Sequence, residues 1–276
     1  MSKPSKGIQS IEVGGQLLLA LGAHGAPMML RDLAQAAGMP AAKAHPYLVS
    51  FGHIGLVEQD PVTGWYRLGA LALRLGLASL QQSEPVRIAT AALADLGQRV
   101  QQTVTLSVWS GRGPTIVRID EADRPLQANL RIGTLMSTVT TATGRVFAAF
   151  LPAEQTAAVI RQERARLAGM HGSVRTAIEQ FDSQVADIRR RGIARGLGSP
   201  LPGIDAFSVP VLDRSGAAVV AVTATGPSGG FDSAWDGPVA AALLELSGRL
   251  SARLGHVAPG RADARPGGAV RPRQQA

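Results

Sequence analysis

Residues 55–69 read Gly-Leu-Val-Glu-Gln-Asp-Pro-Val-Thr-Gly-Trp-Tyr-Arg-Leu-Gly, and this stretch decides the fold of the amino-terminal part of the chain. Two short runs, residues 56–59 and 65–68, flank a segment that contains Pro61 and Gly64. Short runs of this kind, joined by a Pro/Gly turn, are typical of a β-hairpin. The stretch therefore predicts two short antiparallel strands.

Three helical patterns precede the hairpin. In each pattern the apolar residues recur at helical spacing, which places them on one face. They are Val13, Leu17, Leu18 and Leu21, then Leu30, Leu33, Ala34 and Ala37, then Ala44, Tyr47, Leu48 and Phe51. Only Gly38, Met39 and Pro40 separate the second pattern from the third, with Gly38 as a helix stop and Pro40 suited to a first turn. Residues 8–69 are therefore predicted to form a winged helix-turn-helix domain.

In this motif the third helix enters the major groove of DNA near its N-terminus. The outward face of that helix, the wing (the hairpin) and the second helix supply the candidate DNA contacts. These are Arg31, Ala42, Lys43, His45, Ser50, Thr63, Trp65 and Arg67. Alternatives remain open at this point. Instead of contacting DNA, Lys43 and Arg67 are in one alternative ordinary solvated charges. In another, His45 lies partly buried beneath the helix. In a third, Trp65 packs within the wing.

The composition limits the class of protein. With 276 residues the chain exceeds the usual size of one domain, and its apolar fraction of 45% can build a core in each of two. It contains no cysteine, which excludes disulfides and thiolate ligands and suits a reducing compartment. Neither a signal peptide nor an apolar stretch of roughly 20 residues is present. We therefore expect a cytoplasmic protein that does not enter a membrane.

The formal net charge is +8, which favours a polyanionic partner. The excess is spread thinly, with six basic against four acidic residues in 1–80, 18 against 15 in 81–255, and four against one from 256 onward. Bulk charge is therefore weak support for nucleic-acid binding. The five histidines show no metal-ligand spacing, and no catalytic or nucleotide-binding motif stands out. The sequence predicts no metal, no cofactor and no catalytic residue.

The rest of the chain is predicted to hold a linker helix, a mixed domain and a tail. Residues 70–83 are helical and apolar enough to pack against a second subunit or a neighbouring domain. Residues 84–255 predict an antiparallel sheet with flanking helices, so the fold class is α+β. The predicted strands are residues 103–109, 115–120, 126–132, 206–212 and 217–225, and the later helices are residues 141–151, 178–188 and 239–250. Residues 196–198 read as a loop, and residues 256–276 as a disordered tail.

Several of these segments resemble the IclR family of bacterial transcriptional regulators. Residues 55–69, with Leu33-Ala34 and Ala44-His45 before them, resemble the DNA-binding domain of that family. Farther along, Ala142-Thr143-Gly144-Arg145 resembles a family helix start, and the runs around residues 203–211 and 223–227 resemble its last two sheet motifs. The resemblance covers about residues 8–255 in the same order. It implies a GAF-like effector-binding domain at residues 84–255 and a dimer or dimer of dimers.

The chain departs from the family pattern in both domains. Pro46 stands where many members have arginine in the third helix, and a proline inside a helix can cost about 3 kcal/mol. The helix therefore either starts late, so that Pro46 lies near its first turn, or is kinked there. In the second domain, residues 196–199 replace an acidic cluster, and Ala206 stands where many members have cysteine.

A pocket that loses carboxylates and gains Leu and Ala favours an apolar or aromatic body. With the threonine hydroxyls that remain, this predicts a small organic acid as the effector, with an aromatic acid among the candidates. Its carboxylate is expected at the helix N-terminus formed by Thr141–Thr143, where free N–H groups and the helix dipole favour an anion. Its carbon skeleton is expected against Met136, Leu197 and Ala206. The full set of candidate effector contacts is Met136, Thr140, Thr141, Ala142, Thr143, Arg145, Leu197, Ala206, Thr223 and Thr225. For Arg145, pairing with an acidic side chain is an equal alternative.

The sequence thus predicts a homo-oligomeric transcriptional regulator that binds a double-stranded DNA operator and responds to a small organic acid. Repression is favoured, because the resemblance implies it more often than activation. One alternative is a small-molecule-binding enzyme with a vestigial DNA-binding module, suggested by Pro46 and the thin basic charge. Another is an oligomeric scaffold, suggested only by the apolar linker helix.

Overall fold

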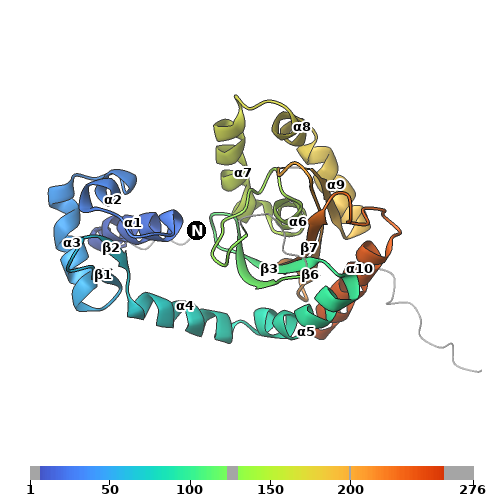
Figure 1. The fold of residues 1–276 in the computed structure, drawn as a ribbon, viewed down its shortest axis with the longest axis horizontal. Helices are drawn as coiled ribbons and strands as arrows, with labels where there is room; N and C mark the ends of the chain where they lie inside the picture. The colour runs from blue at the N-terminus through green and yellow to red at the C-terminus, as the bar shows by residue number, and fades with distance from the viewer. Residues whose placement is uncertain (1–6, 123–129, 199, 258–276) are drawn as a thin grey trace, which may run out of the picture. The chain divides into compact units, whose positions relative to one another are not determined.

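The computed structural model of the protein describes residues 7–122, 130–198 and 200–257. The chain forms two compact units, with the boundary between Arg87 and Ile88. Figure 1 shows the helices and strands of both units.

The first unit has the predicted order of three helices and a hairpin, followed by one further helix (Figure 1). Its elements are α1 (Gln9–His24), α2 (Leu30–Ala36), α3 (Ala41–His53), β1 (Val57–Gln59), β2 (Tyr66–Leu68) and α4 (Ala70–Gln82). The strands β1 and β2 pair antiparallel. Buried side chains from all three helices and the hairpin form one core, which includes Leu17, Leu21, Leu33, Ala34, Ala44, Leu48, Val57 and Tyr66. The helical faces predicted from the apolar spacing are thereby confirmed.

Backbone hydrogen bonds fix the wing to the helices. Between α1 and α2, Met28 exchanges two of them with Tyr66 of β2, at 2.9 and 2.8 Å. The turn between α2 and α3 depends on Gly38, whose φ of 67° lies in the left-handed region. Met39 then donates its N–H to the carbonyl oxygen of Ala34 at 3.0 Å and closes the end of α2. The third helix therefore leaves the second at a defined turn.

Pro46 lies inside α3, five residues after the first helical residue, Ala41. The expectation that the helix starts late is therefore wrong. Since proline has no N–H, the carbonyl oxygen of Ala42 lacks its usual partner four residues on. Both Pro46 and Ala42 are exposed, so water can solvate that carbonyl group. This exposure lets a continuous helix hold the proline.

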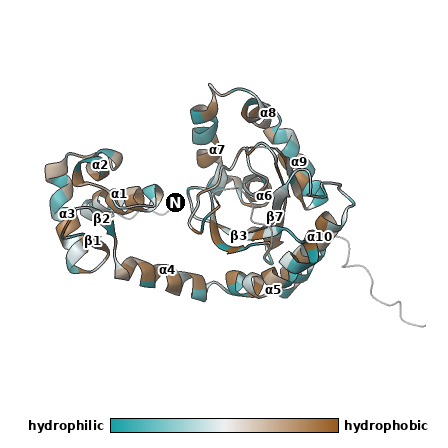
Figure 2. Ribbon diagram, in the orientation of Figure 1, coloured by the Kyte–Doolittle hydropathy of each residue, from teal (hydrophilic) through white to brown (hydrophobic). Residues whose placement is uncertain are grey.

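The helix α4 buries none of its side chains within the described chain. Leu73, Leu75 and Leu77 expose 65%, 55% and 51% of their surface, and Figure 2 shows hydrophobic residues along the length of this helix. So much exposed apolar surface is typical of a helix that packs against something else. The partner that we expect for it stays a prediction.

The second unit is built on a five-stranded antiparallel sheet in the order β4-β3-β7-β6-β5. The strands are β3 (Thr103–Trp109), β4 (Pro114–Asp120), β5 (Ala194–Leu197), β6 (Ile204–Leu212) and β7 (Ala218–Pro227). The helices are α5 (Glu84–Val100), α6 (Ala142–Phe150), α7 (Ala153–Leu167), α8 (Ser173–Glu179), α9 (Phe181–Arg191) and α10 (Pro238–Arg253). An ion pair at 2.8 Å between Arg99 and Glu245 joins α5 to α10. Together these elements confirm the predicted α+β class.

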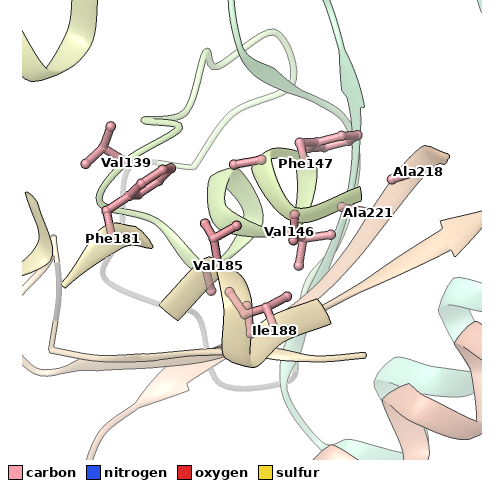
Figure 3. Close-up of a cluster of buried hydrophobic side chains, with 12 residues drawn as sticks. Val139, Val146, Phe147, Phe181, Val185, Ile188, Ala218 and Ala221 are labelled. Carbon is pink, nitrogen blue, oxygen red and sulfur yellow. The ribbon is translucent and has the colours of Figure 1, made fainter. Parts of the chain in front are cut away.

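The two faces of the sheet differ in chemistry. Strand alternation turns Val104, Leu106, Phe207 and Val209 away from α6, toward the side that α10 covers. The face beneath α6 instead carries small or hydroxyl-bearing residues, among them Thr105, Ala206, Ser208, Ala221 and Thr223. On its outer side α6 packs against α9, and Figure 3 shows Val146 beside Val185 and Ile188. The aliphatic face stabilises the unit, and the other face leaves room for polar groups.

The predicted strand over residues 126–132 is not borne out in its described part. Residues 126–129 lie outside the described residues, and residues 130–132 form no strand. A turn replaces it, in which Thr134 donates its N–H to the carbonyl oxygen of Arg131 at 3.0 Å and Gly133 has a φ of 88°. The chain then runs beside β4, where Gly133, Thr134 and Met136 form backbone hydrogen bonds to Ile116 and Pro114 around a bridge between Leu135 and Thr115.

Two other expectations need correction. The helix predicted over residues 178–188 is divided at Gln180 into α8 and α9. The predicted loop at residues 196–198 begins as strand, because Gly196 and Leu197 pair with Ala206 and Asp205 of β6. Most of the predicted disordered tail, residues 258–276, lies outside the described residues.

Among the helices of the described chain, none combines the length and the apolar character that a membrane crossing requires.

Gly144 allows α6 to begin close to the loop before it. A Cβ atom at this position would overlap the backbone of Ser137 and Thr138. The same loop is held from the other side by buried Glu163 of α7, whose carboxylate accepts the N–H of Thr138 at 2.8 Å. The loop has little freedom to withdraw, so a glycine is needed there.

We expect Gly144→Ala to lower the free energy of unfolding by about 1–3 kcal/mol, because the added methyl group forces the backbone apart. The matched control is Gly248→Ala in α10, where a Cβ atom meets open space. This control should raise stability by about 0.5–1 kcal/mol, since alanine is the better helix former. Urea denaturation of both variants measures the difference, and equal effects would contradict the close approach.

Candidate functional site

The outward face of α3, which we expect to contact DNA, is exposed and carries Lys43. Ala44 and Leu48 are buried in the core, whereas Ala42, Lys43 and His45 near the start of the helix are exposed. The alternative of a buried histidine at position 45 is therefore wrong. No acidic residue occurs in α3. The N-terminal part of this face thus presents donors to a polyanion.

The wing tip is held by one carboxylate. Asp60 accepts hydrogen bonds from the N–H groups of Val62 and Thr63, at 2.9 and 2.7 Å, and from the Thr63 hydroxyl at 3.0 Å. These bonds, led by the one from the Thr63 N–H, hold the pKa of Asp60 below its usual value. The Thr63 oxygen in turn accepts the N–H of Trp65 at 3.3 Å. Thr63 is therefore part of the turn structure as well as an exposed residue.

Arg67 is paired on the wing with Glu58 of β1, at 3.1 Å. Both side chains are more than a third exposed, at 59% and 42%, so the pair contributes little to stability and can exchange for a phosphate. Glu58 also accepts the N–H of Ala70 at 3.2 Å, which links the wing to the first residue of α4. Trp65 is 39% exposed. The structure leaves the eight candidate DNA residues exposed, and their contact with DNA stays a prediction.

In the second unit, a small pocket of about 80 Å³ opens between the N-terminus of α6 and the sheet. We call it the hydroxyl pocket. Its described lining consists of Thr105, Leu130, Met136, Thr141, Ala142, Thr143, Pro200, Leu201, Ile204, Ala206, Thr223 and Thr225. Seven of these were expected from the sequence. The lining within the described residues is uncharged.

The first turn of α6 offers unpaired donors to this pocket. The Thr141 side chain caps the helix by accepting the N–H of Gly144 at 3.0 Å, and it donates its own proton to the carbonyl oxygen of Ser137 at 2.6 Å. The N–H groups of Ala142 and Thr143 meet no acceptor in the described part of the chain. Both residues are buried and line the pocket, so an acceptor placed in the pocket could bond to these two N–H groups.

A chain of hydroxyl groups joins α6 to the sheet. The oxygens of Thr143 and Thr223 are 2.8 Å apart, and Thr223 donates to Ser208 at 2.8 Å. Since a hydroxyl has one proton, Thr143 must donate to Thr223. The register of β6, β7 and β3 places Ser208, Thr223 and Thr105 in one row across the sheet. The orientation of the Thr143 side chain is thus fixed.

Three expected effector residues do not line this pocket. The hydroxyl of Thr140 bonds to Ser137 at 2.7 Å. Arg145 and Leu197 line a separate and larger pocket of about 690 Å³, on another side of α6. A helix advances about 100° per residue, so Thr143 and Arg145 point in nearly opposite directions. The alternative in which Arg145 pairs with an acidic side chain finds no such partner among the described residues. The guanidinium of Arg145 instead donates to the carbonyl oxygens of Arg195 at 3.0 Å and Thr140 at 3.4 Å.

Comparison with known proteins agrees with this arrangement. Residues 10–61 match the IclR helix-turn-helix domain, and residues 77–252 match the domain described as bacterial transcriptional regulator IclR C-terminal. The glycerol operon regulatory protein of Streptomyces griseus is 33% identical over 225 residues, which cover 81% of this chain and 86% of that protein. The chain belongs to the IclR family of bacterial transcriptional regulators.

Solved structures of IclR-family proteins share its fold. The crystal structure of HmgR from Pseudomonas aeruginosa is 35% identical, with a TM-score of 0.56 and coverage of 90% of this chain and 99% of that one. A putative IclR regulator from Silicibacter sp. TM1040 is 20% identical, with a TM-score of 0.76 and coverage of 91% and 98%. The predicted family and the predicted two-part fold are thereby confirmed.

Sequence reasoning missed several pocket residues of this IclR-family chain. Thr105 could have been found, because it alternates with the buried residues Val104 and Leu106 on β3. Leu130, Pro200, Leu201 and Ile204 carried no local signal, since they reach the pocket only through the fold. No group of three or more His, Asp or Glu side chains that could hold a metal gathers in the described chain.

We expect Lys43→Ala to weaken binding to operator DNA, because it removes the one lysine of the exposed α3 face. If Lys43 contacts a phosphate, the slope of log affinity against log salt falls by about 0.9. The control is Arg74→Ala, an exposed cation on α4 outside the candidate face. Gel-shift titrations across a salt series measure both. Equal losses in the two variants would contradict the proposed face.

We expect Thr223→Val to lower the free energy of unfolding by about 1–3 kcal/mol, because it leaves the buried Thr143 hydroxyl without its acceptor. The control is Thr115→Val on β4, where the threonine hydroxyl donates to the Ser110 hydroxyl at 2.9 Å in an exposed contact. This change should cost less than about 0.5 kcal/mol. Thermal denaturation of both variants provides the comparison, and Thr223→Ser should restore part of the loss.

Proposed function

We propose that this IclR-family protein is a repressor whose operator binding is modulated by a short-chain organic acid in the hydroxyl pocket. The observation that carries the proposal is the pair of buried N–H groups of Ala142 and Thr143 at the start of α6. A carboxylate can accept both hydrogen bonds and is also favoured by the helix dipole.

The size and chemistry of the hydroxyl pocket support a small ligand. Its volume of about 80 Å³ lies far below the roughly 300–1,000 Å³ of pockets that hold drug-sized ligands. A short-chain acid therefore fits this volume better than the aromatic acid that the sequence suggested. Met136, Leu201 and Ala206 provide apolar contacts for a short carbon skeleton.

Two further observations support operator control. The basic face of α3 and the wing lie in one unit, and the effector pocket lies in the other. A regulator of this type reads two half-sites as a dimer, and the exposed leucines of α4 supply apolar surface for association of two copies. Repression is supported by one relative that is described as a repressor. It is the transcriptional repressor IclR of Escherichia coli, which is 23% identical over 225 residues.

A gel-shift assay with the DNA upstream of the protein's own gene tests operator binding. The expected result is a specific shift that weakens when propionate is added and is unaffected by propionamide, which has the same shape without the charge. Propionate should also raise the melting temperature, since it binds the native state. In Thr223→Val both propionate effects should be reduced. A folded protein that gives no shift at low salt would remove the regulator assignment.

A further inference from the structure

The pocket that contains Arg145 is distinct from the hydroxyl pocket. Its described lining is Arg145, Thr176, Ala177, Gln180, Ser183, Gln184, Asp187, Ile188, Arg195, Gly196, Leu197 and Trp235. These residues come from α6, α8, α9, β5 and the segment before α10. Its volume of about 690 Å³ falls within the range of pockets that hold metabolite-sized ligands. We call it the Arg145 pocket.

Arg145 is a buried cation without a counter-charge. It is only 3% exposed, and no carboxylate in the described chain lies within ion-pair distance of it. Burial lowers the pKa of its guanidinium to about 10, so the group remains protonated at neutral pH. Two carbonyl oxygens accept its hydrogen bonds, but they carry no net charge. A buried charge that is only solvated by carbonyl groups is costly to the fold and is stabilised by an anion.

The one acidic residue of the described lining does not cancel this charge. Asp187 is already bound by Arg190 at 2.9 Å and Arg191 at 2.7 Å. The hydrogen bond from Arg191 is the main reason that its pKa lies below the usual value. Asp187 is therefore neutralised by its own neighbours on α9, and the pocket keeps the charge of Arg145.

A second cation and an aromatic ring stand at the same pocket. The guanidinium of Arg195 lies 4.3 Å from the centre of the Trp235 ring, and Arg191 lies 4.6 Å from that centre. Arg195 donates to the carbonyl oxygen of Ser233 at 3.0 Å, and it too has no carboxylate partner among the described residues. With Leu197 and Ile188, the ring supplies apolar surface next to the two cations.

We propose that the Arg145 pocket is a second ligand site, which binds an organic anion with a flat apolar body and a carboxylate or phosphate group. The anionic group accepts hydrogen bonds from Arg145, as guanidinium groups favour planar oxyanions. The body lies against Leu197, next to the edge of the Trp235 ring, because Arg191 and Arg195 already lie over that ring. This site goes beyond the proposed operator control and does not depend on it, because it shares no lining residue with the hydroxyl pocket.

Trp235 provides a direct readout of this site. The full-length protein with Trp65→Phe and Trp109→Phe keeps Trp235 as its one tryptophan. We expect benzoate or phenyl phosphate to change its fluorescence saturably, and the difference between them to show which anionic group is preferred. Inorganic phosphate and sodium chloride at equal ionic strength should have little effect, because they lack the apolar body.

The decisive comparison is Arg145→Met against Arg189→Met. Like Arg145, Arg189 donates to two carbonyl oxygens, here those of Ala149 and Ala148 in α6. Unlike Arg145, it is exposed and does not line the pocket. Arg145→Met should weaken binding of the organic anion about 10-fold or more, whereas Arg189→Met should leave it unchanged. If Arg145→Met does not fold, Leu197→Asp serves instead, because this half-exposed position tolerates a carboxylate that repels the ligand.

Three results would overturn the second site. One is a folded protein in which no probe changes the Trp235 signal saturably. Another is binding that survives Arg145→Met or Leu197→Asp. The third is binding that Thr223→Val abolishes while Arg145→Met does not, which would place the anion in the hydroxyl pocket. None of these results bears on the gel-shift assay, so failure here is distinguishable from failure of the regulator assignment.

Discussion

The burial of α6 is the constraint on which the second unit depends. Eight of its nine residues, Ala142 to Ala149, are buried, with the sheet on one side and α9 on another. A helix enclosed in this way cannot leave its polar groups to water, so each must find a partner inside the protein. Gly144 permits the close approach, Thr143 bonds to the sheet, and Arg145 bonds to carbonyl oxygens. Where a polar group of α6 has no partner or counter-charge in the described chain, we propose a ligand site.

Two such places lie on different sides of the same helix. The free N–H groups at the start of α6 open into the hydroxyl pocket, and the guanidinium of Arg145 opens into the larger one. Both pockets favour an anion, the hydroxyl pocket through the N–H dipoles of the helix and the Arg145 pocket through a full positive charge. Because a rigid buried helix carries both, a shift of α6 caused by one ligand would change the shape of the other pocket.

The sequence predicted where the helices and strands lie better than it predicted which residues meet in the folded protein. Apolar spacing located the core helices and most strands, since that spacing is a local property. The apolar spacing did not separate Thr143 from Arg145, which are two residues apart in the motif but point to nearly opposite sides of the helix. The short strand at Gly196 and Leu197 was missed because Gly196, with Gly198 just after the strand, resembles a loop. The position of Leu201 and Ile204 at the hydroxyl pocket follows only from how distant strands pair.

Both outer strands of the sheet have backbone groups that are already engaged. Along β4, Ile116 bonds to Gly133 and Thr134, at 2.8 and 3.0 Å. At β5, the carbonyl oxygen of Arg195 is occupied by the side chain of Arg145. An open strand edge is a template for aggregation between copies, and covering it is a common protection. The arginine that lines the Arg145 pocket thus also occupies an acceptor on the β5 edge, which disfavours pairing of that edge with the sheet of another copy.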